Sequence, residues 1–208
     1  MIKVSDVLTR LSILLLDEDF TRWSKDELIA WMNDAVGEIV VRLPAAGGKV
    51  MPITLVDGVL QTLPDSVMSI FDITRNLPNG KGIHIAERQR IEESDPDWYS
   101  LYPSTRIIHY CYDVRTPNLF YVYPPAQAGI QVEASISAAP TINAMDDSID
   151  IASEYMSPIV SYCMYRAMMK DAEYSNAQIS VAYFQAFSEA LGTNTQVTLA
   201  ASPVEAKP

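Results

Sequence analysis

The sequence predicts an α+β protein in which helices from both ends of the chain form a bundle and an antiparallel β module is inserted between them. Apolar residues recur every three to four positions near both ends of the 208-residue chain and every second position in the middle. Beyond residue 192 no period remains. We therefore expect a helical module of residues 1–44 and 148–192, a β-sheet or sandwich module of residues 45–147, and a flexible C-terminal tail of residues 193–208.

Two helices are predicted before the β module. Ser5 is a residue type that caps helix N-termini, and an apolar face follows it, which favours a helix to about Leu16. Ser24 and Glu27 then have the spacing of a capping box, and a second apolar face runs until Leu43-Pro44 ends the helix. Trp23 precedes the second helix, and Trp31 lies beside the apolar face of that helix. We expect both indoles to pack in the core.

The first strands are predicted from alternation and turn residues. Asp57-Gly58 favours a hairpin between residues 51–55 and 59–63. The segment 77–80, Leu-Pro-Asn-Gly, joins a second expected pair at about residues 67–75 and 82–88. A short polar link at residues 88–93 is predicted to be helical.

An aromatic hairpin is the most distinctive part of the middle segment. Eight of the chain's 19 aromatic residues lie between Trp98 and Tyr123, in two β-prone runs around a Pro117-Asn118 turn. We expect Pro124-Pro125 to end its ladder of hydrogen bonds and residues 130–136 to form the last of six or seven strands. The expected core residues of this hairpin are Tyr110, Tyr112, Phe120, Tyr121 and Tyr123.

One long helix is predicted near the C-terminus. A short helical turn at residues 151–156 is expected to precede it, and Ser157-Pro158 fits its start. Gly192 fits a C-cap after Leu191, so the helix would be about 50 Å long at ~1.5 Å per residue. It could pack only within its own subunit, or part of it could also pack against neighbouring subunits, which we favour. The tail after it could be an ordinary frayed terminus or a segment that folds on a partner.

Composition limits the partners. The formal net charge is −11, and residues 1–44, 45–147 and 148–208 carry −3, −5 and −3 respectively. A chain without a basic stripe is a poor candidate for sequence-specific nucleic acid binding. The acidity could simply aid solubility, or it could let a polyanion slide past. No apolar run is long enough for a membrane span, and the N-terminus does not resemble a signal peptide.

Catalytic and metal motifs are not found in the sequence. Phosphate-binding loops, nucleophile elbows and zinc-protease motifs have no match, and we expect no cofactor and no enzymatic activity. Cys111 and Cys163 are expected to be buried free thiols. His84 and His109 lie far apart in the sequence without a nearby Cys or carboxylate at ligand spacing, so no metal site is predicted.

Five segments together resemble one protein family. Three belong to the aromatic region, namely Asp95–Trp98, His109–Asp113 and Pro117–Pro125, and two are helical, at residues 23–33 and 162–187. In order and spacing they are similar to the head-to-tail adaptor (neck) proteins of short-tailed and related bacteriophages, the tail tubular protein A-like family. The resemblance is one of architecture, because none of these segments is catalytic.

The resemblance implies a structural role in the virion, after assembly in the host cytoplasm. Members form a ring, expected to be dodecameric, that docks on the portal protein and makes a conduit through which DNA passes. The C-terminal segment, with Gly192, Val197, Leu199 and Val204, would engage the portal. The loop residues Asn79, Gly80, Lys81 and Trp98 would face the nozzle, tail tube or tail fibre proteins. An alternative is a tail-associated carbohydrate-binding or carbohydrate-active accessory protein that uses the aromatic hairpin as a sugar platform.

Overall fold

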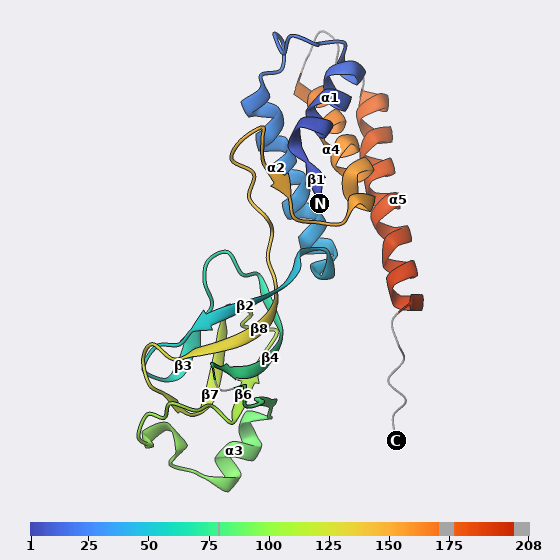
Figure 1. The fold of residues 1–208 in the computed structure, drawn as a ribbon. Coiled ribbons are helices and arrows are strands. Elements are labelled where there is room, and N and C mark those ends of the chain that lie inside the picture. The colour runs from blue at the N-terminus through green and yellow to red at the C-terminus, as the bar shows by residue number, and fades with distance from the viewer. Residues whose placement is uncertain (79, 171–176, 202–208) are drawn as a thin grey trace. The chain divides into compact units, whose positions relative to one another are not determined.

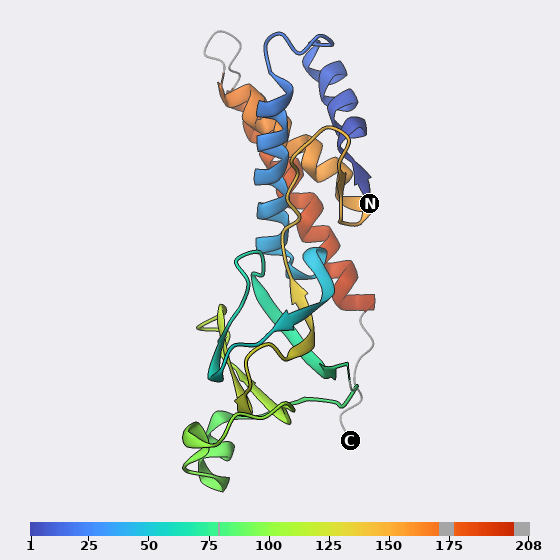
Figure 2. The same cartoon turned by 60° about the vertical axis from the view of Figure 1, so that its left-hand side comes forward.

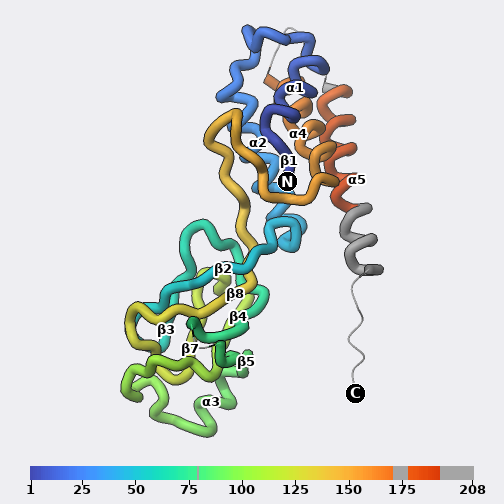
Figure 3. Tube along the Cα trace, viewed as in Figure 1, coloured from blue at the N-terminus to red at the C-terminus, as the bar shows by residue number. Residues whose placement is uncertain are grey.

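The chain divides into two compact units. The computed structural model describes residues 1–78, 80–170 and 177–201. One unit consists of Met1–Ala46 and Pro140–Pro208, and the other of Gly47–Ala139. We call them the helical module and the β module. The Cα trace passes from α2 into the β module and returns to the helical module after β8 (Figure 3).

The helical module is built around α4. Helices α1, α2 and α5 each pack against it (Figure 1, Figure 2). The elements are β1 (Ile2–Lys3), α1 (Val4–Leu15), α2 (Lys25–Arg42), η1 (Pro44–Gly47), β9 (Ser148–Ile149), η3 (Ser153–Tyr155), α4 (Met156–Lys170) and α5 (Ala177–Ala201). Strands β1 and β9 pair antiparallel, which joins the N-terminus to the segment that returns from the β module. One continuous cluster of mostly aliphatic side chains fills the module.

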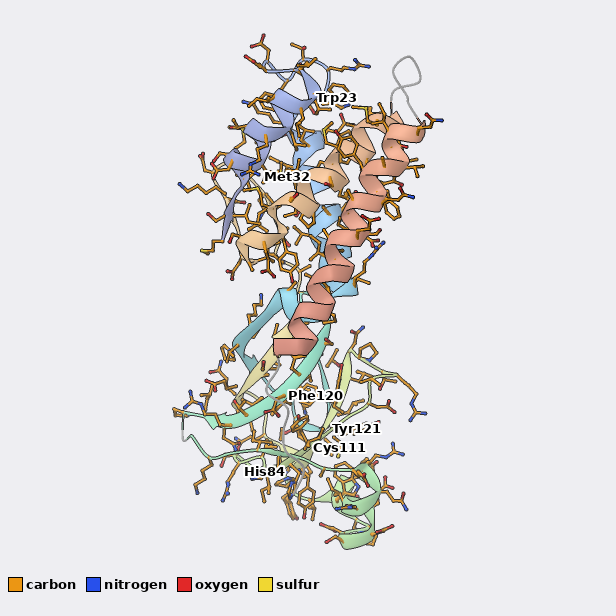
Figure 4. All side chains as sticks on the ribbon, turned by 90° about the vertical axis from the view of Figure 1, so that its right-hand side faces the viewer. Trp23, Met32, His84, Cys111, Phe120 and Tyr121 are labelled. Atoms are coloured by element: carbon orange, nitrogen blue, oxygen red, sulfur yellow. The ribbon has the colours of Figure 1, made fainter. Side chains whose placement is uncertain are left out.

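The N-terminal helices follow the prediction with two corrections. The Ser24 side chain accepts a hydrogen bond from the Glu27 N–H at 3.3 Å, as expected of an N-cap. The Glu27 carboxylate does not complete the capping box, because it binds Lys170 Nζ at 2.6 Å. The expected cap at Ser5 is wrong, since α1 begins at Val4 after Lys3 and the β1–β9 ribbon fixes that start. Trp23 and Trp31 are buried as expected (Trp23 is labelled in Figure 4).

The C-terminal helix differs most from its prediction. Two helices, α4 and α5, pack side by side where one helix of residues 158–191 was expected. Pro158 lies inside the first turn of α4, which starts at Met156, and η3 confirms the short turn before it. Gly192 is not a C-cap, because α5 continues to Ala201. Residues 193–201, expected to be flexible, therefore belong to a helix, and residues 202–208 lie outside the described part.

The β module contains two sheets and a covering helix. The sheet orders are β2-β8-β4 and β3-β7-β6-β5, and α3 and η2 follow β5 in the chain. The bounds are β2 (Gly48–Thr54), β3 (Gly58–Thr62), β4 (Ser69–Leu77), β5 (His84–Ile85), α3 (Arg88–Ser94), η2 (Trp98–Ser100), β6 (His109–Tyr112), β7 (Leu119–Ala126) and β8 (Gln131–Ser137). Aliphatic side chains with Tyr110 and Phe120 form its main core. A smaller cluster of Ile91, Trp98 and Cys111 lies beside it.

The aromatic hairpin is confirmed as the antiparallel pair β6–β7, and residues 131–137 form the expected last strand β8. The ladder does not stop at the two prolines, because β7 runs to Ala126 and the Ser104 N–H donates to the Pro125 carbonyl at 2.7 Å. A proline has no N–H to donate, but its carbonyl still accepts.

Two other strand pairings were predicted wrongly. Residues 51–55 and 59–63 do not pair with each other, because β2 pairs with β8 and β3 with β7. The Gln61 side chain replaces that ladder by accepting from the Val56 N–H (2.7 Å) and donating to the Val56 and Gly58 carbonyls. The expected return strand after Gly80 forms a single bridge, Arg75 to Gly82, and β5 then pairs parallel with β6.

Candidate interaction surfaces

Trp98 is buried at the centre of an aromatic cluster. Its side chain has no exposed area, and its ring centroid lies 4.2 Å from that of Tyr99 and 6.2 Å from that of Tyr123. The expectation that Trp98 faces a tail protein is therefore wrong for the described chain. Its exposed neighbours are Tyr99 and Tyr102, the latter with 94% of its area exposed.

The expected core residues of the hairpin separate into two groups. Tyr110 and Phe120 are buried between the sheets, and the Tyr110 hydroxyl donates to Asp72 Oδ1 at 2.9 Å. Tyr112, Tyr121 and Tyr123 are only partly buried, and they pack beside the two clusters (Figure 4 labels Phe120, Tyr121 and Cys111). The buried rings of Tyr110 and Phe120 cannot stack on a sugar, so two of the five side chains are removed from the carbohydrate alternative, which no other observation supports.

A pocket of about 1460 Å³ lies on the α3 side of the hairpin. Tyr121, Tyr123 and Cys111 line it from β6 and β7, and residues of α3 line it from the other side. Its charged groups are arranged in pairs within the chain. Arg88 lies 3.2 Å from Glu92 and its guanidinium is 6.0 Å from the Tyr121 ring centroid, while Arg115 binds Asp113 at 2.9 Å.

Three ionisable groups that line the pocket have shifted pKa values. Burial raises the pKa of the Cys111 thiol, which keeps it protonated and poorly nucleophilic. The pKa of Tyr123 is raised mainly by burial and also by the negative charge of Asp95. The Tyr123 hydroxyl donates a hydrogen bond to Asp95 Oδ2 at 3.3 Å. Hydrogen bonds from Arg115 lower the pKa of Asp113. The shifts keep the Cys111 thiol and the Tyr123 hydroxyl protonated and the Asp113 carboxyl ionised near neutral pH.

The histidines are closer than the sequence suggested. His84 and His109 are direct partners in the parallel β5–β6 pair, and their ring centroids are 6.4 Å apart. The argument that they lie far apart is therefore wrong in three dimensions. Within the described residues no group of three or more His, Cys, Asp and Glu side chains is placed to hold a metal ion. Cys111 and Cys163 are buried free thiols, as expected.

The helical module exposes an apolar patch at the end of α1. This α1 patch consists of Ile13, Leu14 and Leu16, with exposed fractions of 59%, 49% and 92%. Leu16 has a left-handed backbone with φ of 52°, which is uncommon for a residue with a bulky side chain. A rigid loop holds it in place.

Asp17 organises that loop. Its carboxylate accepts hydrogen bonds from the N–H groups of Thr21, Arg22 and Trp23 at 2.9 to 3.0 Å, and from the Thr21 hydroxyl at 2.9 Å. These hydrogen bonds lower the pKa of Asp17, and the bond from the Trp23 N–H has the largest effect. The carboxylate therefore fixes the chain between α1 and α2, and the α1 patch is displayed on a preorganised surface.

A second exposed apolar surface lies on α5. Val181 and Phe184, one helical turn apart, are 53% and 36% exposed, and we call them the α5 patch. Between Ala177 and Gly192 the sequence has one charged residue, Glu189. Phe184 is partly packed, because its ring centroid lies 5.0 Å from that of Tyr165 and 5.7 Å from the Arg42 guanidinium. Phe187 and Leu191 of the same helix are buried.

The other residues predicted to contact the tail or the portal lie after β4 and in or beyond α5. Gly80 has a φ of 66° and turns the chain after β4, and Lys81 is exposed beside it. Asn79 lies outside the described residues. Gly192 is an exposed residue within α5, and the backbones of Val197 and Leu199 belong to the same helix. Val204 lies outside the described part.

The chain is a two-module α+β protein with exposed apolar patches on its helical module and a pocket beside its aromatic hairpin. No helix in the described residues is able to cross a membrane. The family model of the SU10 adaptor protein matches residues 2–207. The chain therefore belongs to the SU10 adaptor protein family, and it is a bacteriophage adaptor with a structural role in the virion. The tail tubular protein A-like subgroup is a narrower assignment that this match does not test. No curated protein matches the sequence.

Proposed function

We propose that this adaptor forms a homo-oligomeric ring, a dodecamer in the virion, between the portal protein and the tail or nozzle, and that the ring is a conduit for DNA. Membership of the adaptor family supports the proposal most directly. The net charge of −11 also supports it, because an acidic conduit does not bind the DNA backbone and lets it slide.

A ring needs two different surfaces on each subunit. In a closed ring each subunit presents one patch to one neighbour and another patch to the next. The α1 patch and the α5 patch have this property, because they lie on different helices that both pack on α4. We propose that the α1 patch of one copy contacts the α5 patch of its neighbour.

The two ends of the ring would bind different partners. We propose that Gly192–Pro208 docks on the portal, with the turns of α5 beyond Leu191 and the apolar Val197, Leu199 and Val204 as the contact. Asn79, Gly80 and Lys81, at the turn after β4, would face the nozzle, tail tube or tail fibres. Exposed Tyr99 and Tyr102 replace the buried Trp98 in this role.

The experiment is to mix the purified protein with its portal ring and measure the masses of each component and of the mixture by light scattering. We expect about twelve copies to join one portal. If the protein never binds the portal at high concentration, the proposed function is wrong.

Variants separate the two contacts. Leu14→Asp and Val181→Asp should each leave the fold intact, because both side chains are about half exposed, and should reduce the number of copies bound. Truncation after Gly192 should abolish portal binding. The matched control is Val56→Asp in the β module, whose side chain is 58% exposed and lies in neither patch. If Val56→Asp is as damaging as Leu14→Asp, the patches do not form the subunit interface.

A further inference from the structure

The chain has two histidines, and they lie on neighbouring strands of the β module. His84 is on β5 and His109 on β6, and they occupy the same register position. Directly paired residues on neighbouring strands point to the same face of a sheet. Two hydrogen bonds flank the pair, from the His84 N–H to the Ile108 carbonyl at 3.1 Å and from the Ala86 N–H to the Tyr110 carbonyl at 2.8 Å. The backbone positions that carry the two imidazoles are therefore held side by side.

Both imidazoles have nitrogen atoms without a partner in the described chain. Nδ1 of His109 is buried and has no hydrogen bond. Buried polar atoms are seldom left in this state, so an unpartnered one calls for an explanation. The His84 ring is exposed and makes no side-chain hydrogen bond within the described residues, although it lies beside the His109 ring. Each histidine thus has a lone pair to offer.

The two rings are near enough to share a metal ion after a small rotation. Because a Zn²⁺–N bond is about 2.0–2.1 Å, two imidazole ligands of one tetrahedral ion place their ring centroids roughly 5 Å apart. The observed distance between the centroids is 6.4 Å, so one ring has to move toward the other. His109 is held by the Tyr123 ring, which stacks on it at a centroid distance of 6.2 Å, whereas the exposed His84 side chain is free to rotate toward it.

The ligand type selects the metal. Imidazole nitrogen suits Zn²⁺, Cu²⁺ and Ni²⁺, whereas Ca²⁺ and Mg²⁺ prefer oxygen ligands. We propose that His84 and His109 together bind one divalent transition-metal ion of this class and so link β5 to β6. The two remaining positions would be filled by water or by a group from a neighbouring protein. With two protein ligands the site is open rather than a closed structural zinc centre.

The test uses the full chain without a histidine tag. ZnCl₂ and NiCl₂ are titrated by calorimetry, and the imidazole proton signals, which come from these two residues alone, are followed by NMR. We expect one ion per chain and a simultaneous change of both imidazole signals. His84→Ala should weaken binding at least about tenfold, because it removes one of two ligands at an exposed position.

Further variants keep the result interpretable. His109→Phe retains a ring against Tyr123 while removing the ligand, and it should weaken binding as much as His84→Ala. Cys111→Ser, two residues from His109, should bind as the parent does. Saturating Zn²⁺ should raise the melting temperature of the parent but not of His84→Ala. Absence of saturable binding, or equal binding by His84→Ala, would overturn the proposal.

Discussion

The two modules stabilise their irregular segments by the same device but bury their apolar surface differently. In each module single side chains fix a connecting segment: Asp17 and Asn33 in the helical module, Gln61 and Asn76 in the β module. The helical module has exposed apolar side chains on two helices, α1 and α5. The β module buries Trp98, Tyr110 and Phe120 but exposes other apolar side chains along its strands and loops, such as Val56, Ile85 and Tyr102.

Both modules therefore present apolar surface that a partner could cover. The helical module differs in that the α1 patch and the α5 patch lie on two helices that both pack on α4. The pocket of the β module already pairs its own charges, so it gains little from a charged partner.

The largest expected effect tests whether the modules are separate cooperative units. Phe120→Ala, at a position with no exposed area, should lower the free energy of unfolding of the β module by about 3–5 kcal/mol. Hydrogen exchange should rise in residues 47–139 and stay unchanged in α2 and α4. Met32→Ala should destabilise the helical module, so hydrogen exchange should rise in α2 and α4 and stay unchanged in residues 47–139. Equal loss of protection in both modules would contradict the comparison.

A matched pair of amides comes next. Asn76 accepts from the Ile107 N–H at 2.8 Å and donates to the Ile107 carbonyl, and Asn33 makes the same two bonds to Ile142. Asn76 is 3% exposed, whereas Asn33 is half-buried and open to replacement by water. Asn76→Ala should cost about 3 kcal/mol and Asn33→Ala about 1 kcal/mol, measured by urea unfolding. A larger cost for Asn33→Ala would mean that burial does not set the difference.

The third prediction concerns acid. The pKa of Asp17 is lowered from its usual value of 3.8. Its stabilising contribution is therefore complete above that value and is lost as the pH falls through the lower folded-state pKa. Asp17→Asn should cost about 1–2 kcal/mol at pH 7, as loss of a capping carboxylate does. The difference between the parent and Asp17→Asn should shrink below pH 3.8, and a constant difference down to pH 2 would exclude this role.

The smallest effect is expected at the surface of the helical module. Lys170 binds Glu27 at 2.6 Å, but the Lys170 side chain is 53% exposed. Lys170→Met should change the free energy of unfolding by less than about 1 kcal/mol, because solvent screens exposed ion pairs. Thermal unfolding at low and at 0.5 M salt measures this, and a loss comparable to that of Asn76→Ala would show a larger role for the pair.

Several features were predictable because they depend on neighbouring residues. The two N-terminal helices, the cap at Ser24 and the β6–β7 hairpin follow from period, cap and turn residues. The break between α4 and α5 had a signal that the prediction passed over: Ser175-Asn176 are residue types that favour a new helix start. A weaker signal favoured the extension of α5 through Gly192. The first proline after Gly192 is Pro203, so no strong helix breaker lies between them.

The α+β class, the acidic charge and the two free thiols follow from the amino-acid sequence, because composition and local period carry that information. The pairing of most strands, the burial of Trp98 and the contact between His84 and His109 are visible only in the folded chain. They depend largely on residues that are distant in the sequence, such as His84 and His109, which are 25 positions apart. The free energy of such contacts comes from packing and shared hydrogen bonds between distant segments, which no local pattern encodes.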